Sequence, residues 1–346
     1  MSETPFLKWM AADTQTLWWH DSADPAELAA GLASGASGVT TNPVLVRQAV
    51  YARSTAWGAT LSDLPAGLAP AARAEEIVRR VTTAIAARLH PTFQASCGAT
   101  GYVCAQVDPR FPGDYDVMLP MARRLAAWAP NIAVKLPVTA AGLAVLEECA
   151  AAGITVTATI SFTVSQALAI AESYRRGMAR AKAAGIPAGQ CFAVLMVGRV
   201  DDYLRDIAHD RRSKATEADI VQSGTAIAKR AHELFQERRY EARIMPAGLR
   251  GAYHVAAVAG ARMVVSVHPR VQALVAELKP PFRPGIGEAV APAVIQRLKT
   301  IPEFVRSYEP DGLSVEEFLP FGLVQRTLSQ FVESGWLPLE SYGLTV

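Results

Sequence analysis

The chain has 346 residues, of which 51% are hydrophobic and 19% charged, so it can bury a sizeable core and is not intrinsically disordered. Its 34 Lys+Arg and 32 Asp+Glu leave a formal net charge of +2. No segment is a basic run, which excludes a strong electrostatic case for binding nucleic acid or an anionic membrane. The sequence has no apolar stretch of the length, about 18 residues, that spans a membrane, and Met1–Lys8 lacks the pattern of a secretory signal. Because its four cysteines form no CxxC pair, we expect a reduced, cytoplasmic protein.

Short apolar runs alternate with helical patterns along most of the chain, which is typical of βα units and a parallel sheet. We predict strands at Leu17–Asp21, Gly38–Thr41, Tyr102–Val107, Ile132–Leu136, Thr155–Ile160, Phe192–Val197, Ala242–Met245 and Met263–Val267. The predicted helices between them include Asp24–Ser34, Asp114–Ala129, Ala140–Ala152, Val164–Ala184, Glu217–Arg238 and Gly251–Ala259. This alternation favours an α/β fold, a (β/α)8 TIM barrel, over an open sheet.

We expect residues 1–346 to form one domain built on this barrel, which spans about 17–278. A helical insertion at about 52–100, with the amphipathic segment Ala71–Leu89, separates the second and third strands. A C-terminal extension at about 286–346 holds helices near Glu288–Ser307 and Ser314–Ser334. The apolar positions of Phe321–Phe331 fit either closure over a site or a homodimer contact.

Lys135 lies on the predicted fourth strand, Ile-Ala-Val-Lys-Leu. Strand alternation places it with Ala133 on the inner face of the barrel, in a largely apolar shell. Such surroundings disfavour the ammonium form and so favour the neutral amine that forms a Schiff base. The alternative is a strand-end lysine whose amine reaches solvent.

Other strands also carry polar residues toward their ends, where barrel sites are built. The fifth strand has three threonines on one face: Thr155, Thr157 and Thr159. Gln106 and Asp108 share a face of the third strand, and the first strand ends at Asp21 after Leu-Trp-Trp-His. A carboxylate at such a position needs a cationic partner or takes part in proton transfer. Asp24 is instead expected to cap the following helix, because it precedes Pro25.

Thr40-Thr41-Asn42-Pro43 follows the second strand. Asn42 fits a helix cap before Pro43, and it fits equally well an amide directed at a substrate. Cationic side chains follow the late strands: Arg199, Arg250 and His268. Together they would suit an anionic group, although each alone could form a surface ion pair.

Motifs for metals, nucleotides and serine nucleophiles are absent from the sequence. The six histidines are never paired at helical spacing, and neither GxGxxG, a P-loop nor GxSxG occurs at a strand end. We therefore expect no metal and no cofactor. The chemistry that remains is that of an amine, a carboxylate, an amide and hydroxyl groups.

At these strand ends the chain resembles the transaldolase family. The motifs that carry the resemblance run in family order from about residue 17 to 278: Asp21-Ser-Ala-Asp, Gly38-Val-Thr-Thr-Asn-Pro43, Gln106-Val-Asp-Pro-Arg110, Val134-Lys-Leu-Pro-Val-Thr139 with Gly142-Leu143, Gly153-Ile154 leading to Thr159, Val197-Gly-Arg199, and Arg250. The resemblance implies a class I aldolase-type barrel in which Lys135 forms a Schiff base with a ketose donor. It also implies that Asp21 is the acid/base group for C–C cleavage, that Asn42 holds the intermediate and that Thr159 positions a water. Arg199 and Arg250 would bind the anionic end of a small sugar substrate.

Three departures from the family pattern concern the site. Gln106 stands where typical transaldolases have Glu, as in the fructose-6-phosphate aldolase branch, and Gln cannot exchange a proton at neutral pH. Gly248-Leu249-Arg250 replaces the family's Ser-Phe-Arg, and Met196 replaces an aromatic residue. The leading hypothesis is transfer of a dihydroxyacetone unit to an aldehyde. The alternatives are a lyase that releases dihydroxyacetone and a catalytically silent barrel that serves as a binding subunit.

Overall fold

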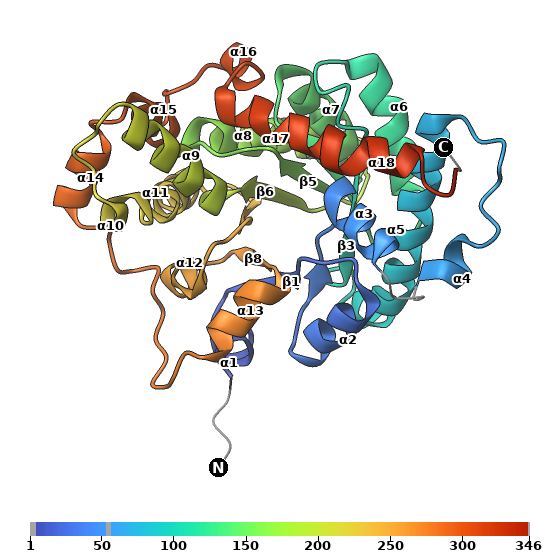
Figure 1. Ribbon diagram of the computed structural model, residues 1–346, viewed down its shortest axis with the longest axis horizontal. Helices are drawn as coiled ribbons and strands as arrows, with labels where there is room; N and C mark the ends of the chain where they lie inside the picture. Colours follow the sequence, from blue (N-terminus) through green and yellow to red (C-terminus); the bar gives the residue numbers. More distant parts are fainter. Residues whose placement is uncertain (1–4, 53–56, 345–346) are drawn as a thin grey trace.

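The structure of the protein is a computed structural model that describes residues 5–52 and 57–344. The chain forms a barrel of parallel strands surrounded by helices (Figure 1). The hydrogen-bonded strand order is β7-β6-β5-β4-β3-β2-β1-β8, and every paired ladder is parallel. β7 and β8 also contact each other, which brings the two ends of the sheet together. The strands are β1 (Leu17–His20), β2 (Gly38–Val39), β3 (Tyr102–Gln106), β4 (Ile132–Pro137), β5 (Val156–Thr159), β6 (Cys191–Leu195), β7 (Arg243–Pro246) and β8 (Val264–Val267). The predicted (β/α)8 barrel is confirmed.

An aromatic layer fills the barrel interior below the strand ends. The ring of Trp19 on β1 lies 4.6 Å from that of Phe192 on β6 and 6.4 Å from that of Tyr102 on β3. Because β1 and β6 are not neighbours in the sheet, the first of these contacts crosses the barrel. A Cβ atom on Gly38 would lie 2.5 Å from the Trp19 ring, so the indole requires glycine at that position. Strand alternation then places Asp21, two residues after Trp19, in the layer above.

The helices are α1 (Phe6–Asp13), α2 (Pro25–Ala33), α3 (Pro43–Tyr51), α4 (Gly58–Leu61), α5 (Pro70–Ala95), α6 (Tyr115–Ala126), α7 (Ala140–Ala151), α8 (Val164–Ala183), α9 (Val197–Asp210), α10 (Glu217–Ile220), α11 (Ser223–Glu237), α12 (Ala252–Val258), α13 (Pro269–Ala276), α14 (Pro292–Leu298), α15 (Pro302–Tyr308), α16 (Val315–Phe318), α17 (Gly322–Phe331) and α18 (Leu337–Glu340), with a π-helix η2 (Val332–Trp336). Several begin at side-chain caps. The Asp24 carboxylate accepts the backbone N–H groups of Ala26 and Glu27, as predicted for α2. In the same way, Thr139 caps α7 and Thr163 caps α8.

Three predicted helices are each divided in two. Glu217–Arg238 breaks before Ser223, because Oδ1 of Asp201 accepts the Ser223 hydroxyl and the Gly224 N–H and starts a new helix there. Glu288–Ser307 breaks before Pro302, and Ser314–Ser334 breaks around Pro320. Proline cannot donate the backbone hydrogen bond of a helix interior, which explains both of these breaks. Helices α1, α9 and α13 are not among the predicted helices named above.

The last helices lie across one end of the barrel, where α17 and α18 (red) pass over the upper part of the molecule (Figure 1). The η2 segment contacts α3, and α18 contacts α5. Helix α5 in turn contacts β3, so the segment between the second and third strands supplies a helix that covers the barrel. Four apolar side chains of α17 are buried within the chain and are therefore not free for a dimer contact: Leu323, Val324, Leu328 and Phe331. Over the described ranges, no helix combines the length and apolar character needed to cross a bilayer.

Candidate active site

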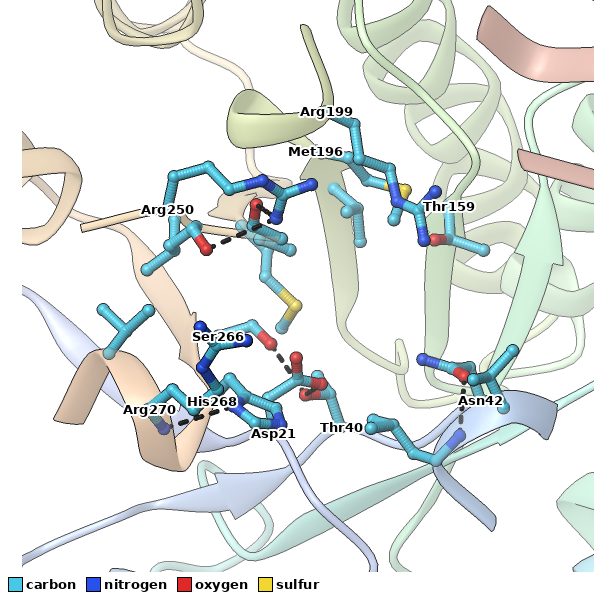
Figure 2. Close-up of a pocket in the computed structure, with 18 of the residues that line it drawn as sticks. Asp21, Thr40, Asn42, Thr159, Met196, Arg199, Arg250, Ser266, His268 and Arg270 are labelled. Atoms are coloured by element: carbon cyan, nitrogen blue, oxygen red, sulfur yellow. Dashed lines mark hydrogen bonds between the residues drawn. The ribbon is translucent and has the colours of Figure 1, made fainter. Parts of the chain in front are cut away.

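A cavity of about 750 Å³ opens at the carboxyl ends of the strands. This is the end of a (β/α)8 barrel where active sites are built. Most of the residues singled out from the sequence line it: Asp21, Asn42, Lys135, Thr159, Arg199, Gly248, Arg250 and His268. Figure 2 shows Arg199 and Arg250 on one side of the cavity and the group of Asp21, Thr40, Ser266 and His268 on the other.

Lys135 reaches the cavity from the middle of the β4 ladder. Its side chain is buried, and its Nζ donates a hydrogen bond to the backbone carbonyl of Thr41 at 3.1 Å. Across the described residues, no carboxylate lies within ion-pairing distance of this amine. A neutral backbone acceptor therefore orients the amine.

Asp21 is held by hydroxyl groups from the neighbouring strands. Its Oδ1 accepts the hydroxyl of Thr40 at 2.6 Å, and Oγ1 of Thr40 lies 2.7 Å from Oγ of Ser266. Thr40 follows β2 and Ser266 belongs to β8, and these two strands flank β1 in the sheet. Neither hydroxyl is a site residue predicted from the sequence. Inward polar positions on the second and eighth strands are the signal that could have found them.

Arg199 lies in the first turn of α9, and Arg250 follows β7. Burial, together with the nearby charge of Arg250, lowers the pKa of Arg199 to about 10. Its guanidinium lies 5.7 Å from the centre of the Phe331 ring, so α17 provides an aromatic face for this cation. Arg250 is bound differently, since its Nε and Nη2 donate to Oδ2 of Asp202 at 2.8 and 2.6 Å. The two cations nevertheless face the same cavity.

Gly248 lies between β7 and Arg250 with a φ of +61°, in the left-handed region that favours glycine. Its carbonyl oxygen accepts a hydrogen bond from Nη1 of Arg250 at 2.7 Å. A Cβ atom on Gly198 would lie 2.3 Å from the same oxygen. The positive φ thus favours glycine at 248, and the close approach of the start of α9 to this loop requires glycine at 198.

Asn42 and His268 both cap helices while lining the cavity. Oδ1 of Asn42 accepts the Leu45 N–H at 3.0 Å, which leaves the amide NH2 group for the cavity. A helix cap and an amide directed at a substrate are therefore compatible roles for Asn42. Nδ1 of His268 accepts the Arg270 N–H at 3.2 Å. This bond uses Nδ1, so Nε2 is the ring nitrogen that remains for the cavity.

Three further candidates, Gln106, Thr41 and Thr157, are absent from the cavity wall formed by the described residues. Gln106 and Thr157 are the ladder partners of Lys135 on β3 and β5, and Thr41 supplies the carbonyl that binds its amine. Oε1 of Gln106 and Oγ1 of Thr159 are buried and have no hydrogen-bond partner within the described parts of the chain. Of the two residues, Thr159 lines the cavity and Gln106 does not.

Gln330 and Phe331, at the end of α17, complete the wall. They are about 130 residues away from Arg199 in the chain, and no local sequence pattern indicates that contact. Asp108 is not in the wall; its carboxylate binds Arg110, which also pairs with Glu340 on α18. Within residues 5–52 and 57–344, no three His, Cys, Asp or Glu side chains gather closely enough to hold a metal ion.

The protein is therefore a (β/α)8 barrel whose cavity, at the carboxyl ends of the strands, contains a buried lysine amine and a carboxylate. The family model described as Transaldolase/Fructose-6-phosphate aldolase matches residues 18–300. The chain belongs to this family.

Several relatives share sequence with more than half of the chain. Transaldolase 1 of Streptomyces avermitilis is 32% identical over 214 residues, which cover 58% of this chain and 54% of that protein. The transaldolase of Mycolicibacterium paratuberculosis is 31% identical over 220 residues, or 59% of this chain and 57% of the relative. That of Mycolicibacterium smegmatis is 29% identical over 252 residues, or 68% and 66%. The chain thus spans between about half and two thirds of the length of these relatives.

Proposed function

We propose that the protein transfers a dihydroxyacetone unit from an anionic ketose donor to an aldehyde acceptor through a Schiff base on Lys135. One observation carries the proposal: the Lys135 amine, the Asp21 carboxylate and the two arginines line a single cavity. Amine, acid/base group and anion-binding groups are the three elements that this reaction needs. Membership in the family and the names of the relatives support the same reaction.

The Lys135 amine attacks the donor carbonyl, and loss of water gives a protonated imine. Asp21 then takes the proton of the C4 hydroxyl, the C3–C4 bond breaks, and its electron pair moves into the imine to form an enamine. The shortened aldose leaves. The acceptor aldehyde enters, the enamine carbon attacks its carbonyl carbon, and Asp21 returns the proton to the new hydroxyl oxygen. Hydrolysis of the second imine frees the product and restores the amine.

The remaining residues bind the water and the parts of the substrate on either side of the C3–C4 bond. Thr159 and Gln106 flank the Lys135 strand and offer their buried oxygens to the water that forms and hydrolyses the imine. The Asn42 amide faces the dihydroxyacetone part. Arg199 and Arg250 bind the anionic end, a phosphate or a similar group such as a sulfonate. His268 adds an N–H donor at the opposite wall.

The second candidate is a lyase that releases free dihydroxyacetone. Gln106 favours it, because an amide next to Lys135 in the ladder holds a water but exchanges no proton with it. Product analysis with and without an acceptor aldehyde separates the two reactions. Release of dihydroxyacetone at full rate without acceptor would favour the lyase.

Both the transferase and the lyase reaction can be tested by chemical trapping of the Schiff base at Lys135. Fructose 6-phosphate plus borohydride should add a reduced donor fragment to the peptide that contains Lys135, as seen by mass mapping. The matched control is Lys229→Ala, because Lys229 is also buried but bonds to the carbonyls of Gly285 and Glu288 outside the cavity. Labelling should disappear in Lys135→Ala and persist in Lys229→Ala. If no ketose labels Lys135, the catalytically silent barrel that serves as a binding subunit becomes the favoured hypothesis.

A further inference from the structure

We propose that Thr40 and Ser266 are positioning residues that keep Asp21 hydrogen-bonded in both of its protonation states. The inference rests on the acid/base role proposed above for Asp21. All three side chains line the cavity, and the two hydroxyl-bearing residues are buried. Asp21 and Thr40 directly follow β1 and β2, and Ser266 belongs to β8, so the three side chains are brought together by adjacent strands of the barrel.

The direction of the hydrogen bonds follows from counting donors. A charged carboxylate has no hydrogen to donate, so the single hydroxyl hydrogen of Thr40 points to Oδ1 of Asp21. Oγ1 of Thr40 must then accept at its 2.7 Å contact with Ser266, so Ser266 donates. With Asp21 charged, the chain of donation therefore runs from Ser266 through Thr40 to Asp21.

Cleavage puts a proton on Asp21, and when that proton lies on Oδ1 the direction of donation reverses. The protonated carboxyl donates to Thr40, Thr40 turns its hydrogen to Ser266, and the Ser266 hydrogen turns to the cavity. Thr40 keeps one donor and one acceptor role while Ser266 changes from donor to acceptor, so the reversal needs only two rotations about C–O bonds and moves no heavy atom. The number of protons is conserved, because the only proton gained is the one that Asp21 takes from the donor hydroxyl.

Backbone hydrogen bonds hold Thr40 and Asp21 in place independently of the hydroxyls. The Thr40 N–H donates to the His20 carbonyl at 2.9 Å, and the Asp21 N–H donates to the Val267 carbonyl at 3.2 Å. A Thr40→Val substitution therefore keeps the strand contacts and the side-chain shape while it removes the hydroxyl. Its effect on the reaction reports on the hydroxyl itself.

The experiment measures cleavage of fructose 6-phosphate with D-glyceraldehyde as acceptor, together with borohydride trapping at Lys135. Thr40→Val should lower kcat by about tenfold or more, because it removes a hydrogen bond to a charged group, whereas Ser266→Ala should lower it by about two- to tenfold. KM and the yield of trapped donor at Lys135 should stay near the wild-type values, because imine formation does not use Asp21. Thr40→Ser should restore most of the rate.

A double-mutant cycle separates a relay from independent structural effects. Since Ser266 acts through Thr40, Ser266→Ala should have little further effect in the Thr40→Val background. The matched controls are Thr82→Val and Ser307→Ala, which remove buried hydroxyls that bond to helix carbonyls outside the cavity. Both should turn over at the wild-type rate.

The outcomes distinguish this inference from the proposed function. If wild-type protein is not labelled at Lys135, the proposed function fails. If Lys135 is labelled but Thr40→Val cleaves at the wild-type rate, or if the two substitutions are additive, the relay is overturned and the Schiff-base reaction stands.

Discussion

Nδ1 of the His254 imidazole accepts the backbone N–H of Arg250 at 3.2 Å. An acceptor at Nδ1 places the ring proton on Nε2, which lies 3.0 Å from Oδ2 of Asp201. Both of these side chains are fully buried. Asp201 is tied in turn to the start of α11, where it accepts the Ser223 hydroxyl and the Gly224 N–H. The position of the Arg250 backbone at the cavity therefore depends on a buried pair that does not line the cavity.

His254→Ala should weaken binding of an anionic donor. Loss of one neutral hydrogen bond frees the Arg250 backbone and should raise KM for fructose 6-phosphate about two- to tenfold, with a smaller change in kcat. KM for dihydroxyacetone, which has no anionic end, should stay unchanged in an aldol addition assay. His209→Ala, on an exposed side chain, is the control and should change neither value. An equal rise in KM for the two donors would contradict the positioning role.

Replacing Arg199 should weaken the binding of an anionic donor without lowering the thermal stability of the fold. Its guanidinium has no carboxylate within ion-pairing distance among the described residues, so the fold bears the cost of burying this charge. Arg199→Leu should lower the affinity for an anionic donor by more than about tenfold. Its Tm should be equal to or above that of wild type, because the desolvation cost is removed.

Arg306→Leu is the matched control. Arg306 also lies over an aromatic ring, that of Phe321 at 5.5 Å, but it is paired with Glu317. Its replacement should leave donor affinity unchanged and should not raise the Tm. A clear fall in Tm for Arg199→Leu would show that this cation stabilises the fold.

Anion binding should also depend on pH through Arg199. Burial lowers the pKa of Arg199 to about 10, so the guanidinium is charged at neutral pH and loses its proton earlier than other arginines. The affinity for inorganic phosphate, measured by calorimetry, should fall as pH rises through about 10. In Arg199→Leu the same part of the pH profile should be flat. A wild-type profile that is flat through pH 10 would contradict this assignment.

Arg110 should contribute measurably to stability. It donates to Asp108 and pairs with Glu340 on α18, and both carboxylates are largely buried. Arg110→Ala leaves two carboxylates without their cation and should lower the free energy of unfolding by roughly 2 kcal/mol or more, as measured in urea. The exposed pair Arg230–Glu233 offers the control, because Arg230→Ala should cost less than about 1 kcal/mol. Equal losses in the two variants would mean that burial adds nothing to the Arg110 cluster.

The barrel was predictable because its strands are buried runs bounded by turns and helices. Lys135 and Asp21 were predictable for the same reason, since a charged residue on an inward strand position stands out against its apolar neighbours. Strand alternation placed Thr159 with them. The predicted convergence of the late-strand cations needed only the rule that parallel strands end at one rim.

The rest of the site depends on contacts between distant segments. The Phe331 ring reaches Arg199 because the C-terminal helices fold back over the barrel, and periodicity within α17 says only that one face is apolar. His254 reads as an ordinary helix residue, yet its partner Asp201 lies on another helix. The division of the predicted helix at Ser223 has the same cause, because Asp201 captures the backbone there.

The pair of Asp219 with Arg297 should make stability depend on acid pH. Oδ1 and Oδ2 of Asp219 accept two hydrogen bonds from the Arg297 guanidinium, at 2.6 and 2.9 Å, and Oδ2 also accepts the Thr216 N–H. Arg297, and to a lesser extent Thr216, hold the pKa of Asp219 well below its ordinary value of 3.8. A carboxyl whose pKa is lower in the folded state stabilises the fold above its unfolded pKa and loses that contribution as pH falls toward the folded pKa.

Asp219→Asn should therefore be less stable than wild type at pH 7, and the gap in free energy of unfolding between the two should narrow below about pH 4. Asp206→Asn, at the exposed pair with Arg326, should differ little from wild type at either pH. Urea unfolding at pH 7 and pH 3 measures both variants, and a gap for Asp219→Asn that stays constant between these pH values would refute the linkage.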